Sequence, residues 1–172
     1  MKMRIPFLLA SLLTALVASG CGPKESATTN ASTSGGSTPA ATPAAGPRSI
    51  ELTAGDNMKF NLATIEAKPG EDLKVTLTNI GTLPKEAMGH NWVLLKKGSD
   101  PAAFSTAAMM AKDTDYIPAA LKDQIIAHTQ TLGPRKSDEV SFKAPTEPGE
   151  YPFLCSFPAH FPAGMKGVLV VK

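Results

Sequence analysis

The feature that most constrains this chain is a group of three metal-binding residue types near its C-terminus. Cys155, His160 and Met165 lie within eleven positions, in the segment Cys155-Ser-Phe-Pro-Ala-His160-Phe-Pro-Ala-Gly-Met165. Three separate structural roles do not fit into so short a segment, whereas one loop of this length can wrap one ion. A second histidine, His90, lies 65 residues before Cys155 in Met88-Gly89-His90-Asn91-Trp92. We therefore expect a fold that brings two distant segments together at one metal.

These residue types indicate which metal the site would bind. One thiolate, two imidazoles and a weak thioether are the ligands of a blue-copper electron-transfer site. Each residue also has an ordinary interpretation. Cys155 follows an apolar strand and would by default be a small core residue, His160 alone would be a surface-loop residue, and His90 would be a turn residue. The close spacing of three donors in one Pro- and Gly-containing turn favours the copper site.

Short β-type runs separated by Gly, Pro, Asn and Asp fill the chain from Ser49 onward. Alternation is clearest in Leu73-Lys-Val75-Thr-Leu77-Thr, where one face of the strand is apolar. About eight such strands in one domain are typical of an antiparallel sandwich, so we predict an all-β Greek-key β-sandwich. The expected strands are 50–53, 59–66, 72–79, 90–96, 124–127, 138–143, 151–155 and 167–172.

One short inserted helix is expected over residues 101–112. Pro101 suits its first turn, and Ser99 or Asp100 suits the N-terminal cap. Met109 and Met110 lie near its end, and we interpret them as core or gap-filling residues rather than as ligands.

Several segments, in consistent order over residues 49–172, closely resemble the azurin-like cupredoxins of the plastocyanin/azurin family. They are Leu83-Pro84-Lys85, Met88-Gly89-His90-Asn91-Trp92-Val93-Leu94, Asp115-Tyr116, Ile126-Ala127-His128-Thr129, Ser141-Phe142 and the closing Cys-x4-His…Met-Lys-Gly. The layout also resembles the auracyanins, membrane-tethered azurin relatives of photosynthetic bacteria. The resemblance implies a cupredoxin fold, one type 1 Cu(I)/Cu(II) ion and single-electron transfer.

The resemblance also implies roles for particular residues. His90, Cys155, His160 and Met165 would bind the copper, and the backbone carbonyl of Gly89 would form a long second axial contact, which the missing side chain permits. Asn91 resembles the asparagine that ties the two ligand loops, although it could also form a simple Asx turn. Ser156 is expected beside it. Trp92 is expected to pack in the core rather than to relay electrons.

Four features depart from the family pattern or take no part in the site. No cysteine occurs between Ser49 and Leu73, where azurins carry a disulfide. Asn79 stands where azurins often have a pH-titrating histidine. Four residues separate His160 from Met165, one more than in azurin, so the potential cannot be carried over. His128 resembles a surface histidine and is not expected to bind the metal.

The first 20 residues have the pattern of a secretory leader. Lys2 and Arg4 precede an apolar run from Ile5 to Val17, which is too short to span a membrane, and Ala18-Ser19-Gly20 leads into Cys21. This resembles a bacterial lipobox, so we predict a lipoprotein signal peptide over 1–20 and lipidation of Cys21. The alternative is an ordinary signal peptide cleaved near Gly20. Gly22 is not the aspartate of an inner-membrane retention signal, which favours the outer membrane.

A linker over residues 21–48 is predicted to join Cys21 to the cupredoxin domain at 49–172. Residues 22–47 are almost entirely Ser, Thr, Ala, Gly and Pro and cannot form a core. Such a tether spans about 30 Å on average and about 85 Å at full extension. Removing Lys2 and Arg4 leaves fifteen basic and 15 acidic residues, which argues against nucleic-acid binding.

An electron carrier is the function that these observations favour. An enzyme would need an open coordination position or a second metal with its own histidines, and the chain has only three histidines. The alternative is a periplasmic copper-binding or carrier lipoprotein, but Met58, Met88, Met109 and Met110 are scattered rather than clustered.

We expect electrons to leave through His160 at an uncharged docking patch on the periplasmic side of the membrane. An exposed apolar patch commonly marks a docking surface, and small interfaces suit transient redox encounters. The expected partners are c-type cytochromes, a terminal reductase or oxidase, or a photosynthetic complex. The patch is predicted to contain Met58, Leu83, Met88, Pro158, Ala159, Phe161, Pro162 and Ala163.

Overall fold

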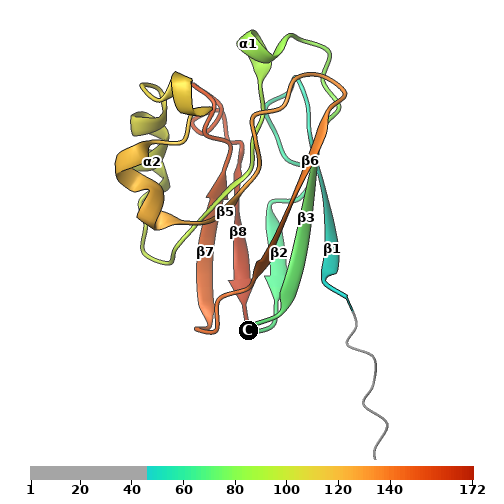
Figure 1. Ribbon diagram of the computed structural model, residues 1–172, viewed down its shortest axis with the longest axis vertical. Coiled ribbons are helices and arrows are strands. Elements are labelled where there is room, and N and C mark those ends of the chain that lie inside the picture. Colours follow the sequence, from blue (N-terminus) through green and yellow to red (C-terminus); the bar gives the residue numbers. More distant parts are fainter. Residues whose placement is uncertain (1–45) are drawn as a thin grey trace, which may run out of the picture. The chain divides into compact units, whose positions relative to one another are not determined.

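The computed structural model describes residues 46–172, which form two facing β-sheets (Figure 1). The three-stranded sheet has the order β1 (Arg48–Ala54), β3 (Asp72–Asn79), β6 (Ser137–Lys143). The five-stranded sheet has the order β2 (Thr64–Ala67), β8 (Lys166–Val171), β7 (Gly149–Leu154), β4 (Val93–Leu95), β5 (Ile125–His128). The pairs β1–β3 and β2–β8 are parallel, and the other pairs are antiparallel. The predicted sandwich is confirmed, whereas the leader, Cys21 and the linker up to residue 45 lie outside the described residues.

Alternating side chains explain how the sheets enclose a core. In β3, Leu73, Val75 and Leu77 are fully buried, while the polar residues between them are half-buried. Trp92 is also fully buried and lies between the sheets, with ring centroids 5.9 Å from Phe142 of β6 and 5.8 Å from Phe153 of β7. The prediction that Trp92 is a core residue is confirmed.

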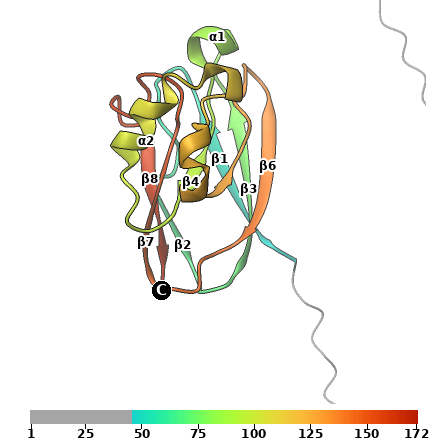
Figure 2. The ribbon, with the colours of Figure 1, turned by 60° about the vertical axis from the view of Figure 1, so that its left-hand side comes forward.

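The helix α2 (Pro101–Ala108) covers the outer face of the five-stranded sheet (Figure 2). Asp100 caps it by accepting hydrogen bonds from the backbone N–H groups of Ala102 (2.8 Å) and Ala103 (3.2 Å). Phe104 packs with Val93, Leu95, Ile117 and Leu154 in a second hydrophobic cluster. The helix therefore holds the outer face of β4, whose opposite face contributes Leu94 to the main core.

Two helical predictions need correction. The predicted helix over 101–112 ends at Ala108, so Met109 and Met110 lie beyond it and are 51% and 90% exposed rather than buried. The chain also forms a single turn, α1 (Lys85–Met88), and two 3₁₀ segments, Lys112–Thr114 and Ala119–Gln124. Asp115 and Tyr116 follow the first of these with left-handed φ values of 54° and 63°, which a continuing helix would not allow.

Two predicted strands are shorter in the structure because their first residues pair locally. Strand 59–66 is reduced to β2, and Phe60 instead forms an isolated bridge with Ala54. Strand 90–96 is reduced to β4, and His90 forms an isolated bridge with Leu132. The second difference matters for function because it fixes a predicted metal ligand outside the regular sheet.

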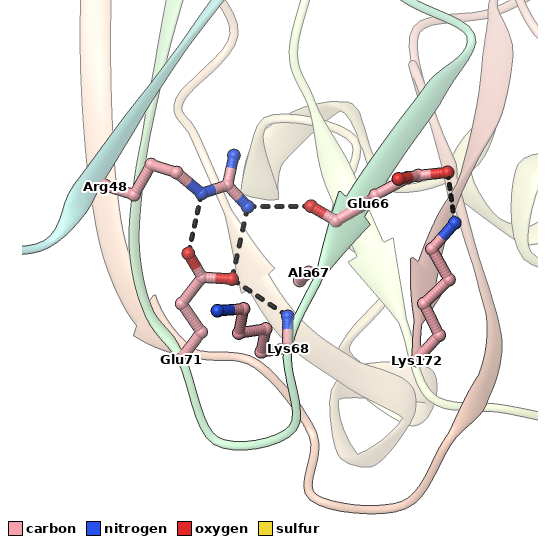
Figure 3. A pocket seen from close by; sticks show the side chains of 6 residues that line it. All are labelled: Arg48, Glu66, Ala67, Lys68, Glu71 and Lys172. Carbon is pink, nitrogen blue, oxygen red and sulfur yellow. Dashed lines mark hydrogen bonds and ion pairs between the residues drawn. The ribbon is translucent and has the colours of Figure 1, made fainter.

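Ion pairs close the end of the sandwich at which β1 begins and β8 ends (Figure 3). The Arg48 guanidinium donates to Glu71 at 2.6 Å and to the Glu66 carbonyl at 2.7 Å, and Lys172 pairs with the Glu66 carboxylate at 2.6 Å. None of the helices within residues 46–172 is both long enough and apolar enough to span a membrane.

Candidate metal centre

Three possible metal donors lie close together, and one of them follows α1, which lies at one end of the sandwich (Figure 1). His90 follows α1, and its backbone exchanges two hydrogen bonds with Leu132, of 3.1 and 2.7 Å. Cys155 follows β7, and His160 lies in the loop that joins β7 to β8. The side chains are almost entirely buried, with exposed fractions of 0% for His90, 0% for Cys155 and 2% for His160. The fold therefore brings together the two segments that the sequence predicted to meet.

The donor atoms are close enough to share one ion. Those of His90, Cys155 and His160 all lie within 4.8 Å of one another, and the Cys155 Sγ is 3.4 Å from His160 Nδ1. Within residues 46–172, neither ring nitrogen of His90 has a hydrogen-bond partner. Buried polar atoms are almost always paired, so an imidazole without a hydrogen-bond partner beside a thiol fits a role as a metal ligand. One thiolate and two imidazoles fit copper.

Burial controls the protonation of these groups. It raises the pKa of the Cys155 thiol to about 12, and the Asn91 and Phe157 backbone N–H groups offset part of that rise. Burial, together with His90, lowers the pKa of His160 to about 4. Burial also lowers the pKa of His90, although the charge of the Asp56 carboxylate acts in the opposite direction. At neutral pH both imidazoles are ready to bind a cation, whereas the thiol must release its proton to the solvent.

The loop between β7 and β8 is held in a compact turn. His160 N–H donates to the Phe157 carbonyl at 3.1 Å, and Met165 N–H donates to the His160 carbonyl at 2.9 Å. Ala159 and Gly164 have φ values of 69° and 97°, in the left-handed region that permits the reversals. The Met165 side chain is fully buried, and its carbonyl accepts a hydrogen bond from Cys155 N–H at 3.1 Å. Both ends of the loop are thus fixed to each other.

Gly89 is required by close packing just before His90. A side chain there would meet the Lys85 carbonyl at 2.7 Å, Thr131 Cγ2 at 2.7 Å and the Phe157 ring at 3.0 Å. Any larger residue would push this segment away from the ligand loop. The predicted axial roles of Gly89 and Met165 remain predictions.

Asn91 joins the two ligand segments through reciprocal hydrogen bonds. Its side-chain amide donates to Ser156 Oγ at 2.8 Å and accepts from Ser156 N–H at 2.8 Å. Its backbone N–H donates to the Cys155 sulfur at 3.5 Å. Such contacts around a metal ligand fix its orientation and tune the metal. Asn91 therefore has a tertiary role beyond a local Asx turn.

Several residues that were not predicted from the sequence surround the hydrogen bonds between Asn91 and Ser156. Thr131 Oγ1 accepts from the Asn91 amide at 3.4 Å and donates to the Asp115 carbonyl at 3.0 Å. The Phe157 ring lies 4.8 Å from both the His160 and the Tyr116 rings, between centroids. Phe157 could have been predicted as part of the site because it lies between Cys155 and His160 in the sequence. No motif in the sequence marks Thr131.

Asn79 lies buried beside the segment that pairs with His90. Its amide donates to the Leu132 carbonyl at 3.1 Å and accepts from Gly81 N–H at 2.8 Å. An amide does not titrate in the physiological range, so this position holds its neighbours together without a charge change. His128, the remaining histidine, is exposed on β5 and is not one of the three grouped donors.

The predicted docking residues differ in exposure. Leu83, Ala159 and Pro162 are exposed, whereas Met58, Met88, Pro158 and Ala163 are half-buried. Phe161 is also half-buried, packs against the second hydrophobic cluster and has Lys166 Nζ 4.7 Å from its ring centroid. The predicted lipid site, Cys21, lies outside the described residues.

A buried cluster of two histidines and one cysteine at the end of a two-sheet sandwich defines a blue copper protein, or cupredoxin. Comparisons with known proteins agree with this class. Residues 48–172 match the family of copper binding proteins called the plastocyanin/azurin family. Azurin from Pseudomonas chlororaphis is 39% identical over 127 residues, covering 72% of this chain and 97% of that protein. Azurin from Alcaligenes faecalis is 38% identical over 124 residues, covering 70% and 94%.

Solved structures show the same relationship. Dithionite-reduced auracyanin from Roseiflexus castenholzii matches with a TM-score of 0.65 and 36% identity, covering 74% of this chain and 99% of that one. Auracyanin A from Chloroflexus aurantiacus, a blue copper protein, matches with a TM-score of 0.65 and 31% identity, covering 74% and 100%. The chain belongs to the plastocyanin/azurin family, and it is an azurin-like blue copper electron-transfer protein whose copper site contains His90, Cys155 and His160.

Proposed function

We propose that the protein is an exported, lipid-anchored electron carrier that shuttles single electrons between membrane or periplasmic redox partners. The observation that carries this proposal is the burial of three donors within 4.8 Å of one another in the folded protein. A bound copper ion supplies the one-electron Cu(I)/Cu(II) couple. The protein supplies donors whose positions are already fixed by packing, so little rearrangement accompanies a change of charge.

Met165 and the Gly89 carbonyl would complete the copper site as weak axial ligands. Met165 is fully buried in the same loop as Cys155 and His160, and Gly89 directly precedes His90. Long axial contacts from methionine sulfur and a backbone oxygen accompany the trigonal ligand set in blue-copper sites. No ligand position then remains open for a substrate, which supports electron transfer rather than catalysis.

The docking patch would provide the route for electrons. Ala159 and Pro162 flank His160 and are exposed, and Leu83 from the other ligand segment is 42% exposed. Together with Met58, Met88, Phe161 and Ala163 they would form a mainly apolar surface near His160, with Lys59 and Lys166 at its edge. We expect it to meet c-type cytochromes, a terminal reductase or oxidase, or a photosynthetic complex in small interfaces that dissociate quickly.

Electron exchange with a c-type cytochrome tests both the centre and the patch. Wild-type protein should be blue when oxidised, and Cys155→Ser should remove the colour because the thiolate is lost. Ala163→Asp should slow cytochrome reduction and self-exchange while the blue colour stays nearly the same. The matched control is Ser141→Asp, which places the same charge on exposed β6. Equal rates for Ala163→Asp and wild type would show that electrons leave elsewhere, and a colourless native copper complex would refute the centre.

The anchor is supported by the sequence. Small residues precede Cys21 as in a lipobox, and a run of mainly Ser, Thr, Ala, Gly and Pro follows it. Wild-type protein expressed in a bacterium should therefore enter the detergent phase, from the outer membrane, whereas Cys21→Ala should be released. Cys155→Ser should still be anchored, and a wild type that stays fully in the aqueous phase would exclude the lipid.

The alternative of copper carriage predicts an exchangeable site. Buried ligands fixed by hydrogen bonds favour retention of the metal instead, which supports the electron carrier. Rapid transfer of copper from the wild type to a weak chelator, faster than electron exchange, would favour the carrier function.

A further inference from the structure

A lysine from a distant loop reaches the copper ligand loop. Lys59 Nζ donates a hydrogen bond to the Ala163 carbonyl, across 104 positions of sequence. Ala163 lies two residues before Met165, and Gly164 between them has a φ of 97°. A side chain at Gly164 would collide with the Lys59 ammonium group. The lysine therefore lies directly against the turn that ends in Met165.

The loop that carries Lys59 is itself fixed. Met58 has a left-handed φ of 53°, and its N–H donates to the Gly55 carbonyl at 2.9 Å. Lys59 N–H donates to Asn57 Oδ1 at 3.2 Å. On the other side, Phe60 is buried with its ring 5.7 Å from that of Phe153, between centroids. The Lys59 backbone is thus held from both sides, so that its side chain bridges a rigid loop to the ligand loop.

At the Met165 end of the ligand loop, over residues 158–164, the other backbone hydrogen bonds are internal. Ala163 N–H donates to the Ala159 carbonyl at 3.2 Å, and Gly164 N–H donates to the Phe161 carbonyl at 2.8 Å. These bonds close the turn on itself, whereas the Asn91–Ser156 hydrogen bonds tie only the Cys155 end to the rest of the domain. The hydrogen bond from Lys59 ties the Met165 end, and hydrogen bonds from charged donors are stronger than neutral ones.

The charge of Lys59 is also uncompensated. Among the ion pairs of residues 46–172, several lysines contact a carboxylate, including Lys85 with Asp115 at 3.1 Å, but Lys59 takes part in none. A positive charge next to a redox centre disfavours the oxidised state, which carries one more positive charge than the reduced state. Lys59 would therefore raise the reduction potential of a copper ion held by this loop.

We propose that Lys59 is a positioning residue that holds the Met165 end of the ligand loop and raises the reduction potential of the centre. The second part of this proposal rests on the proposed copper function, whereas the first part concerns the polypeptide alone. The extra residue between His160 and Met165 lengthens the turn that Lys59 holds.

Three variants of the domain test the proposal. Lys59→Met removes the charge and the donor, and Lys59→Arg keeps both. Lys68→Met is the matched control because it removes the same charge at the ion-paired end of the sandwich (Figure 3). Amide hydrogen exchange at Gly164 and Met165 in the metal-free protein measures the loop alone, and redox titration of the copper form at low and high salt measures the potential.

We expect Lys59→Met to speed exchange at these two amides at least about tenfold, the change expected when a hydrogen bond to a charged group is lost. Its potential should fall, by a shift that decreases as salt screens the charge. Lys59→Arg should keep the exchange rates and the reduction potential close to those of the wild type, and Lys68→Met should change neither quantity. Unchanged exchange in Lys59→Met would overturn the positioning role. An unchanged potential, or an equal shift in Lys68→Met, would overturn the electrostatic role, whereas failure to bind copper in the wild type would refute the proposed function instead.

Discussion

Asn91 is the residue whose loss should affect the centre most without removing a ligand. Asn91→Ala would leave Ser156 N–H and its hydroxyl buried without their present partner. Each such group costs about 1–3 kcal/mol, so the free energy of unfolding of the metal-free protein should fall by about 2–6 kcal/mol. Urea denaturation measures this change. Thr106→Ala, which removes an exposed hydroxyl from α2, is the control and should change stability by about 0.5 kcal/mol or less. Similar losses in the two variants would contradict the role of Asn91.

Residues whose chemistry is local could be predicted from the sequence, and residues whose role depends on tertiary approach could not. Cys155 and His160 were predicted because their spacing places two strong donors in one turn. Thr131 and Lys59 act through contacts with backbone or side-chain atoms 40 and 104 positions away. Threonine and lysine are common residue types, and neither type indicates a long-range contact in the sequence. Thr131 and Lys59 could therefore not be distinguished from ordinary surface residues.

At the scale of elements, the N-terminal cap of α2 gives a measurable prediction. Asp100 accepts two backbone hydrogen bonds that the first turn cannot satisfy itself. Asp100→Ala should therefore lower the free energy of unfolding by about 1 kcal/mol, whereas Asp100→Asn keeps an acceptor and should lower it by much less. Thermal or urea unfolding of the two variants provides the measurement. Equal destabilisation would mean that the charge, and not the acceptor, is what matters.

Element types were predicted better than element ends. Alternation in β3 and the Asp100-Pro101 start of α2 are local signals, and both were correct. The predicted end of the helix at residue 112 was wrong because Met109 and Met110 are apolar but face solvent beyond the last residue of α2. The predicted start of the strand at residue 90 was wrong because the His90 backbone pairs with Leu132, which belongs to a loop rather than to a strand.

At the scale of the whole molecule, the ion-paired end should make stability depend on pH. The Arg48 guanidinium, helped by the Lys68 N–H, lowers the pKa of Glu71 to about 2 from an ordinary value of 4.5. A carboxylate with a lowered pKa stabilises the fold above its unfolded pKa, and this contribution disappears as pH falls towards the folded value. Glu71→Gln should therefore cost about 1 kcal/mol at pH 6, since solvent screens the pair, and almost nothing near pH 2.

Urea unfolding of wild type and Glu71→Gln between pH 2 and 7 would show the two stability curves converging at low pH. Glu139→Gln is the control because the Glu139 carboxylate is 62% exposed and forms a longer surface ion pair, of 3.3 Å, with Lys74. Its effect should be small throughout. A constant gap between Glu71→Gln and wild type at every pH would assign the effect to packing instead.

The parallel pairing of β2 with β8 has a consequence for the order in which the protein matures. Cys155 and His160 lie between β7 and β8, and β8 pairs with both β7 and the much earlier β2. Long-range and parallel pairings of this kind are slow to form. A nascent chain, or one cut before Lys166, can hold His90 but cannot present the other donors in this arrangement. The three donors therefore take this arrangement only when β8 has paired, and the blue colour would report that this strand pairing is complete.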